Sequence, residues 1–107
     1  MFLFRKKKNS NAPDPRLIAR LNGKSLRYVT RRDEGDYKET VIGKGGSLNI
    51  HNDEVIIVCE AGEVLKKPVT EVVMGELLSN DGATFEFDGP EGRITIVAYY
   101  TYYRKVD

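Results

Sequence analysis

His51 and Cys59 are the only histidine and the only cysteine of this 107-residue chain, and they are its best candidates for nucleophilic or metal chemistry. Cys59 lies in the most apolar stretch, where a thiol is usually an inert packing group, so a Cys–His pair has little support. His51 falls at an expected exposed turn, and a metal site there would need further soft or imidazole ligands, of which only Cys59 is available. We therefore expect no catalytic residue, no metal site and no cofactor, and a small enzyme is the least favoured hypothesis.

The glycine-rich stretch at residues 43–47, GKGGS, has a superficial likeness to a phosphate-binding loop. Its glycines and lysine have the wrong spacing for a P-loop, and no helical pattern follows. A hairpin turn is the better interpretation. The carboxylates fall mainly in turns and on strand faces, without a recognisable acid–base couple.

Four of the six tyrosines lie within five residues near the end of the chain. In a strand, Tyr100 and Tyr102 would share one face, and Tyr99 and Tyr103 the other. One pair is expected to join the core, and the other is a candidate surface for stacking against a partner. Packing on both faces, under a docked helix, is the plainer interpretation.

The formal charge of +1 conceals a strong asymmetry along the chain. Residues 1–32 hold ten basic residues against one acid, a net charge of +9, whereas residues 33–107 hold seven against fifteen, a net charge of −8. The basic third either packs against the acidic remainder or contacts an anionic partner. The candidate anion contacts are Arg5, Lys6, Lys7, Lys8, Arg27, Arg31 and Arg32.

Residues 1–13 are expected to form a flexible basic arm, and residues 14–107 a single domain. As a solvated tail, the arm needs no further explanation. Its apolar start, FLF, followed by basic residues would also suit an anionic membrane surface, and its charges would suit nucleic acid. The start does not have the order of a secretory signal, so we expect a cytoplasmic protein, peripheral at the membrane if the arm binds lipid.

A short helix is expected over residues 15–22. Asp14 suits its cap, Pro15 its first turn, and Gly23 the position after its end. A helix this short does not persist alone, so it must dock on the rest of the fold. Its apolar stripe consists of Leu17, Ile18 and Leu21.

From residue 25 onward, alternating side chains and frequent turn signals predict an antiparallel meander. Residues 55–59 are apolar on both faces, which is typical of a central buried strand, and residues 68–79 are open between a helical turn and an irregular strand. Asn52-Asp53 suits a two-residue hairpin turn. The expected strands are residues 26–32, 37–42, 47–51, 54–60, 63–67, 83–87 and 93–104.

In the first strand, partial alternation would place Leu26, Tyr28 and Thr30 on one side. Arg27, Val29 and Arg31 would then lie on the other side. The expected fold is all-β: a small roll or barrel with one short N-terminal helix.

Residues 41–105 resemble PH-like and GRAM-like β-rolls, and the ending resembles small uncharacterised bacterial proteins. The resemblance rests on the stretches GSLNI (46–50), EVIIVC (54–59), VLKKPV (64–69) and IVAYYTYYRK (96–105). It implies a curved β-roll that acts as a binding module without enzymatic activity. PH domains end in a helix, however, whereas this chain ends in an expected strand. Their lipid site also uses basic residues near the first hairpin, and here the turn at residues 33–36 holds three acids.

The first functional hypothesis is therefore a non-catalytic interaction module that binds a protein partner, or itself, through a sheet edge or the tyrosine face. The second is binding of an anionic membrane or nucleic acid through the basic third. No small-molecule substrate is implied.

Overall fold

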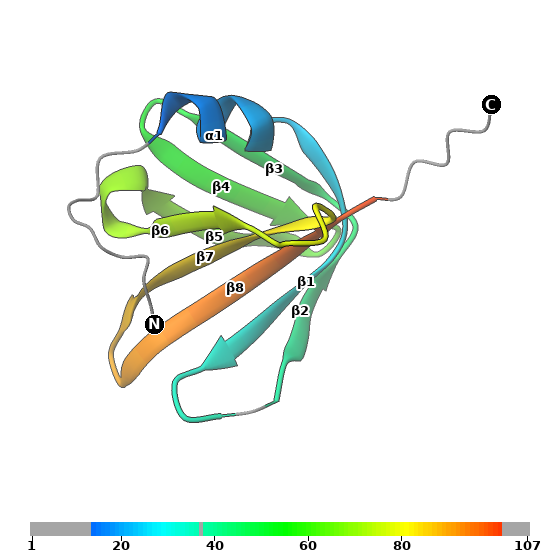
Figure 1. The fold of residues 1–107 in the computed structure, drawn as a ribbon. Helices are drawn as coiled ribbons and strands as arrows, with labels where there is room; N and C mark the ends of the chain where they lie inside the picture. The colour runs from blue at the N-terminus through cyan, green and yellow to red at the C-terminus, as the bar shows by residue number, and fades with distance from the viewer. Residues whose placement is uncertain (1–13, 37, 102–107) are drawn as a thin grey trace.

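The structure is a computed structural model that describes residues 14–36 and 38–101. Within them, eight antiparallel strands and one α-helix confirm the predicted all-β roll with a short N-terminal helix (Figure 1). The elements are α1 (Pro15–Leu21), β1 (Lys24–Asp33), β2 (Thr40–Lys44), β3 (Ser47–His51), β4 (Glu54–Cys59), β5 (Gly62–Pro68), the 3₁₀ turn η1 (Val69–Glu71), β6 (Val73–Glu76), β7 (Gly82–Gly89) and β8 (Gly92–Tyr100). Paired strands follow the order β5-β4-β3-β1-β8-β7-β6, and β2 also pairs with β1.

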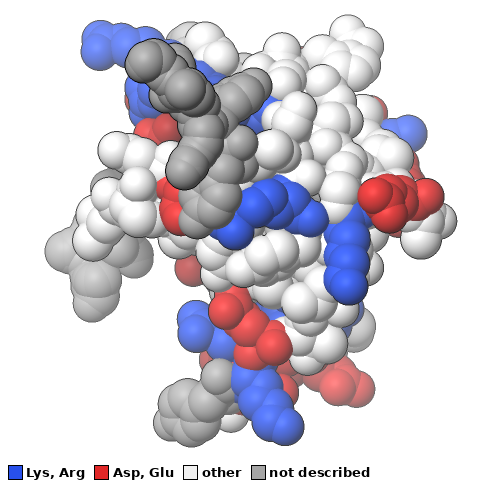
Figure 2. All heavy atoms as spheres, turned by 90° about the vertical axis from the view of Figure 1, so that its right-hand side faces the viewer, with Lys and Arg blue, Asp and Glu red and all other residues white. Residues whose placement is uncertain are grey.

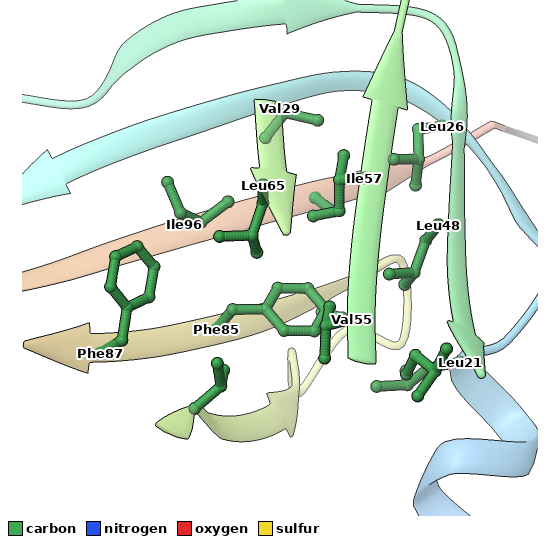
Figure 3. Packing of buried hydrophobic residues seen from close by; sticks show 14 of the residues in the cluster. Leu21, Leu26, Val29, Leu48, Val55, Ile57, Leu65, Phe85, Phe87 and Ile96 are labelled. Atoms are coloured by element: carbon green, nitrogen blue, oxygen red, sulfur yellow. The ribbon is translucent and has the colours of Figure 1, made fainter. Parts of the chain in front are cut away.

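The sheet curls around one apolar core. Val55 and Leu65, from β4 and β5, lie near Phe85 of β7, and Ile96 of β8 lies close by (Figure 3). Phe85 is the largest fully buried side chain. Alternate residues of β3 and β7 are buried, among them Leu48 and Ile50 of β3 and Phe85 and Phe87 of β7.

Helix α1 begins at Pro15, as the sequence predicts, and ends at Leu21, one residue earlier than expected. The Asp14 carboxylate accepts a hydrogen bond from the backbone N–H of Arg16 at 2.9 Å. Gly23 follows the helix with a φ of 89°, a left-handed conformation that glycine adopts without strain. Leu21 is fully buried in the core, while Leu17 and Ile18 pack partly against it, as the predicted stripe requires.

The end of α1 is fastened to β3 by two hydrogen bonds. The backbone N–H of Gly23 donates to the carbonyl oxygen of Leu48 at 2.8 Å. The side-chain oxygen of Asn22 accepts from the backbone N–H of Ile50, also at 2.8 Å. The helix therefore docks over one end of the roll, beside β3 and β4 (Figure 1).

β2 and β3 form one bent line along the same edge of β1. Tyr28 pairs with Lys44, and Ser25 pairs with Ser47, so the register with β1 continues from β2 into β3. The predicted turn at residues 43–46 is therefore wrong as a hairpin: Lys44 is still in β2, and Gly45-Gly46 is a corner within a continuous edge, with φ values of 67° and 102°. Beyond this corner β3 turns to pair with β4.

β1 does not alternate as predicted, because it contains a β-bulge. In the pairing with β8, Leu26 lies opposite Tyr100 and Tyr28 opposite Tyr99, so Arg27 is an extra residue. Leu26 and Val29 therefore both face the core, at 3% and 0% exposure. The expectation that Leu26, Tyr28 and Thr30 share one face is wrong.

The apolar run at residues 55–59 is buried on one face only. Val55, Ile57 and Cys59 belong to the core, whereas Val58 is 40% exposed. The predicted burial on both faces is thus wrong, because β4 lies in a single curved sheet. The hairpin at Asn52-Asp53 is confirmed, with φ values of 54° and 62°.

Residues 68–79 contain both of the structures that the sequence leaves open: the η1 turn is followed by the short strand β6. The expected second strand begins at Thr40 rather than at residue 37, which lies outside the described residues. The last expected strand is β8, described to Tyr100; Tyr102 and Tyr103 lie outside the described residues, as does the expected arm at residues 1–13.

Replacing Gly46 with alanine tests the corner. A Cβ there would overlap the carbonyl oxygen of Val58 and lie 2.7 Å from the Cα of Cys59. We expect Gly46→Ala to lower the free energy of unfolding by more than about 3 kcal/mol in urea denaturation, because backbone must move to relieve the clash. The control is Gly35→Ala: Gly35 also has a positive φ, of 83°, but has nothing within 4 Å of its added Cβ. It should cost only about 1 kcal/mol, and similar losses in both variants would contradict a steric corner.

Candidate functional site

The bulge at Arg27 creates an aromatic pair on the outer face of the sheet. The rings of Tyr28 and Tyr99 lie with centroids 4.7 Å apart, tilted by 39°. The guanidinium carbon of Arg27 lies 5.3 Å from the Tyr28 centroid and 5.9 Å from the Tyr99 centroid, within cation–π range. Arg27 Nε also donates to the carbonyl oxygen of Tyr100 at 2.7 Å. Tyr99, a predicted partner contact, and Arg27, a predicted anion contact, thus belong to one cluster.

Glu39 joins this cluster from the segment before β2. Its Oε2 accepts hydrogen bonds from the Tyr99 hydroxyl at 3.0 Å and from the Thr30 hydroxyl at 2.7 Å. Burial raises the pKa of Tyr99, and the hydrogen bond and negative charge of Glu39 raise it further. The carboxylate therefore keeps the phenol protonated and fixes the Tyr99 ring beside Tyr28.

A row of uncharged side chains crosses four strands on the same outer face. Thr84 pairs with Val97, Val97 with Thr30, and Thr30 with Val41. Thr30 and Val97 are buried, whereas Val41 at the end of the row is 50% exposed. The row therefore opens to solvent at β2.

Tyr100 lies on the opposite face of β8, where its ring packs against the core. Its hydroxyl is buried and has no hydrogen-bond partner among the described residues. Lys24 Nζ lies 5.0 Å from the Tyr100 ring centroid. The division of Tyr99 and Tyr100 between two faces agrees with the sequence pattern.

The basic candidates do not gather on one surface of the described structure. Arg31 Nε donates to the Asp33 carboxylate at 2.7 Å, and strand alternation places Arg32 on the other face. Figure 2 shows basic and acidic side chains interspersed on one side of the molecule. The remaining candidates, Arg5, Lys6, Lys7 and Lys8, lie outside the described residues.

The structure separates His51 from Cys59. They lie at opposite ends of the β3–β4 pair, five residues apart along β4, which is roughly 17 Å. Burial raises the pKa of the Cys59 thiol, and the nearby Glu60 raises it further, so the unreactive thiol is favoured. Among residues 14–36 and 38–101, no group of His, Cys, Asp and Glu side chains could hold a metal ion.

Sequence reasoning missed two residues of the outer-face cluster, Tyr28 and Glu39. Alternation assigned Tyr28 to the face of Leu26, since a one-residue bulge has no clear sequence signal. Glu39 bonds to Tyr99 across sixty residues of sequence, and no local pattern indicates such a contact.

Comparisons with protein-family models, with curated proteins and with solved structures find no match for this chain. The resemblance to PH-like and GRAM-like rolls therefore stays a prediction. None of the described helices is both long and apolar enough to cross a membrane.

Replacing Glu39 with glutamine should shift the ionisation of Tyr99 to lower pH, because it removes a negative charge that disfavours the tyrosinate. The titration can be followed by ¹³C NMR of the tyrosine Cζ, with Tyr99→Phe identifying the resonance. The pKa of folded Tyr99 lies above the unfolded value of about 10. The contribution of Tyr99 to the free energy of unfolding is therefore complete below about pH 10 and is lost as the pH rises through the pKa of Tyr99 in the folded protein. Glu63→Gln, on β5, is the charge-matched control, and an equal shift in both variants would exclude the proposed contact.

Proposed function

We propose that this protein is a non-catalytic interaction module that binds an extended segment of a partner protein along the free edge of β2. One observation carries the proposal. Among the described residues, no strand pairs with the outer edge of β2, and its Val41 and Ile42 are 50% and 36% exposed. The carbonyl oxygen of Lys44 accepts from the backbone N–H of Glu60 at 3.0 Å, so the edge is open from Thr40 to Gly43. There it offers backbone N–H and C=O groups to which an extended peptide can add as a further strand.

Among the described strands, β5 and β6 also have an open edge, and both are poorer sites for strand addition. β5 carries Lys66, Lys67 and Pro68 at its end, and lysine and proline on an edge oppose pairing with another chain. β6 has only four residues. β2 has no charged residue from Thr40 to Gly43, so its edge is the least protected of the three.

The side chains around β2 indicate the chemistry of the partner segment. Val41 ends the uncharged row on the outer face and would contact a β-branched or aromatic residue of an added strand. Lys44 of β2 lies opposite Tyr28 of β1 and has no ion pair among the described residues. An acidic residue of the partner near Lys44 would complement its charge.

A partner with a regular strand suits this edge better than a second copy of the chain. The register of β2 on β1 shifts between Val29 and Thr30, which makes Ile42 an extra residue of β2. In a two-fold pairing of β2 with β2, two such bulges would face each other and disrupt the ladder. The proposal therefore favours a different protein over self-association.

Non-catalytic binding is also what the resemblance to PH-like rolls implies. A single buried thiol is ordinary for a protein of the reducing cytoplasm, where we place this module as part of the proposal.

Peptides of ten residues selected by phage display against the immobilised full chain would test the proposal. We expect the selected peptides to lose at least about tenfold in affinity, measured by fluorescence anisotropy, when Val41 is replaced by lysine, because a lysine on an edge strand opposes addition. Hydrogen exchange should slow at residues 40–43 when the peptide binds. Val73→Lys is the matched control, since Val73 is 51% exposed on the edge strand β6.

Selected peptides that bind Val41→Lys as well as wild type would exclude the β2 edge. Retention on heparin or anionic vesicles that depends on residues 5–8 would instead favour the anion-binding hypothesis. A dimer that Val41→Lys dissociates, detected by light scattering, would identify the partner as a second copy.

A further inference from the structure

A cleft of about 630 Å³ lies between the end of α1 and the β6–β7 turn, on a different part of the molecule from β2. Its volume is that of an ordinary small-molecule site. The C-terminal end of α1 and the start of β1 form one wall, and the β6–β7 turn with the end of β8 forms the other. The residues that line the cleft include Arg20, Lys24, Asp81 and Tyr100.

Two cations line this cleft. Arg20 is held by Glu76 of β6, with its Nε and Nη2 within 3.1 to 3.3 Å of the carboxylate oxygens. This pairing leaves the Nη1 side of the guanidinium without a partner among the described residues. The Lys24 side chain has no ion pair among the described residues either, and its Nζ lies 5.0 Å from the centroid of the Tyr100 ring. The cleft therefore keeps hydrogen-bond donors and positive charge for an incoming group.

The Tyr100 hydroxyl is a further polar group near this cleft. It is buried, lacks a hydrogen-bond partner in the described part of the chain, and belongs to a residue that lines the cleft. Burial raises the pKa of Tyr100, the negative charge of Glu76 raises it further, and the positive charge of Arg20 lowers it. A buried hydroxyl without a partner is costly, and its retention beside a cleft indicates a polar group that is absent from the protein itself.

The acidic group of the cleft is already engaged. The Asp81 carboxylate accepts a short hydrogen bond from the Ser79 hydroxyl within the same turn. Asp81 keeps its negative charge, and Arg20 is partly neutralised by Glu76, so Lys24 is the cation of the cleft that has no ion pair among the described residues.

We propose that this cleft binds a small molecule that carries a phosphate or carboxylate group. The anionic group lies against Lys24 and the free side of Arg20, and a turn of the Tyr100 side chain toward the cleft lets its buried hydroxyl donate a hydrogen bond to an oxygen of the ligand. This site is independent of the β2 edge, so either function can hold without the other.

Titrations of the ¹⁵N-labelled full chain with inorganic phosphate and, separately, with acetate at constant ionic strength test this site. We expect saturable NMR shifts of the amides of Gly23, Ser25 and Thr101, which line the cleft. The anion that saturates at the lower concentration identifies the preferred group. Lys24→Gln should weaken binding about tenfold, the usual size of a charge-assisted hydrogen bond, while Lys66→Gln on β5 should change nothing.

Tyr100→Phe separates binding from folding. It should weaken binding of the same anion severalfold but should not lower the melting temperature, because the hydroxyl that it removes has no partner. Shifts that do not saturate, or that are equal in Lys24→Gln and Lys66→Gln, would overturn the proposal. So would a lowered melting temperature of Tyr100→Phe together with unchanged binding.

Discussion

The close approach of Gly46 to the backbone of β4 is the constraint on which this fold depends. A side chain at Gly46 would overlap the backbone of Val58 and Cys59, so only glycine allows the two segments to meet. This contact bends the line of β2 and β3 along β1 and turns β3 toward β4. Among the strands that the structure describes, β2 is then left paired with β1 alone. The open edge of β2, on which the proposed function depends, is therefore a direct consequence of the corner.

The bulge at Arg27 has a similar effect on the side chains of β1. One inserted residue lets Leu26 and Val29 both enter the core while Arg27 and Tyr28 both lie outside. Without it, strict alternation would bury Tyr28 and expose Val29. The Tyr28–Tyr99 pair and the stacked Arg27 are thus produced by a break in the strand pattern rather than by the pattern itself.

Local signals predicted much of the fold. The cap at Asp14, the glycine after α1 and the left-handed Asn52-Asp53 turn all act over a few residues, and all are confirmed. The failures involve contacts distant in sequence. Residues 43–46 have the glycines of a turn, and Gly45 and Gly46 do adopt left-handed angles. They form a corner rather than a hairpin because the strands on both sides of them pair with β1. The sequence singles out Tyr99 and Arg27 as candidate contacts, whereas it does not indicate Glu39 or the pairing of Tyr28 with Tyr99, which depends on the register of β1 on β8.

The fold compensates part of the charge asymmetry seen along the sequence. Arg20 pairs with Glu76 across α1 and β6, and Arg31 pairs with Asp33 within β1, so some of the basic third is compensated by nearby acids. The first of these pairs links the basic third to the acidic remainder, as one of the two initial interpretations required. Exposed pairs of this kind add little stability each, but they do reduce the charge available to an anionic partner. The available charge is local: Lys24 lies at the cleft beside α1 and Lys44 beside the edge of β2. A net charge counted along a sequence therefore indicates a binding surface only after the fold has shown which of its members share a face.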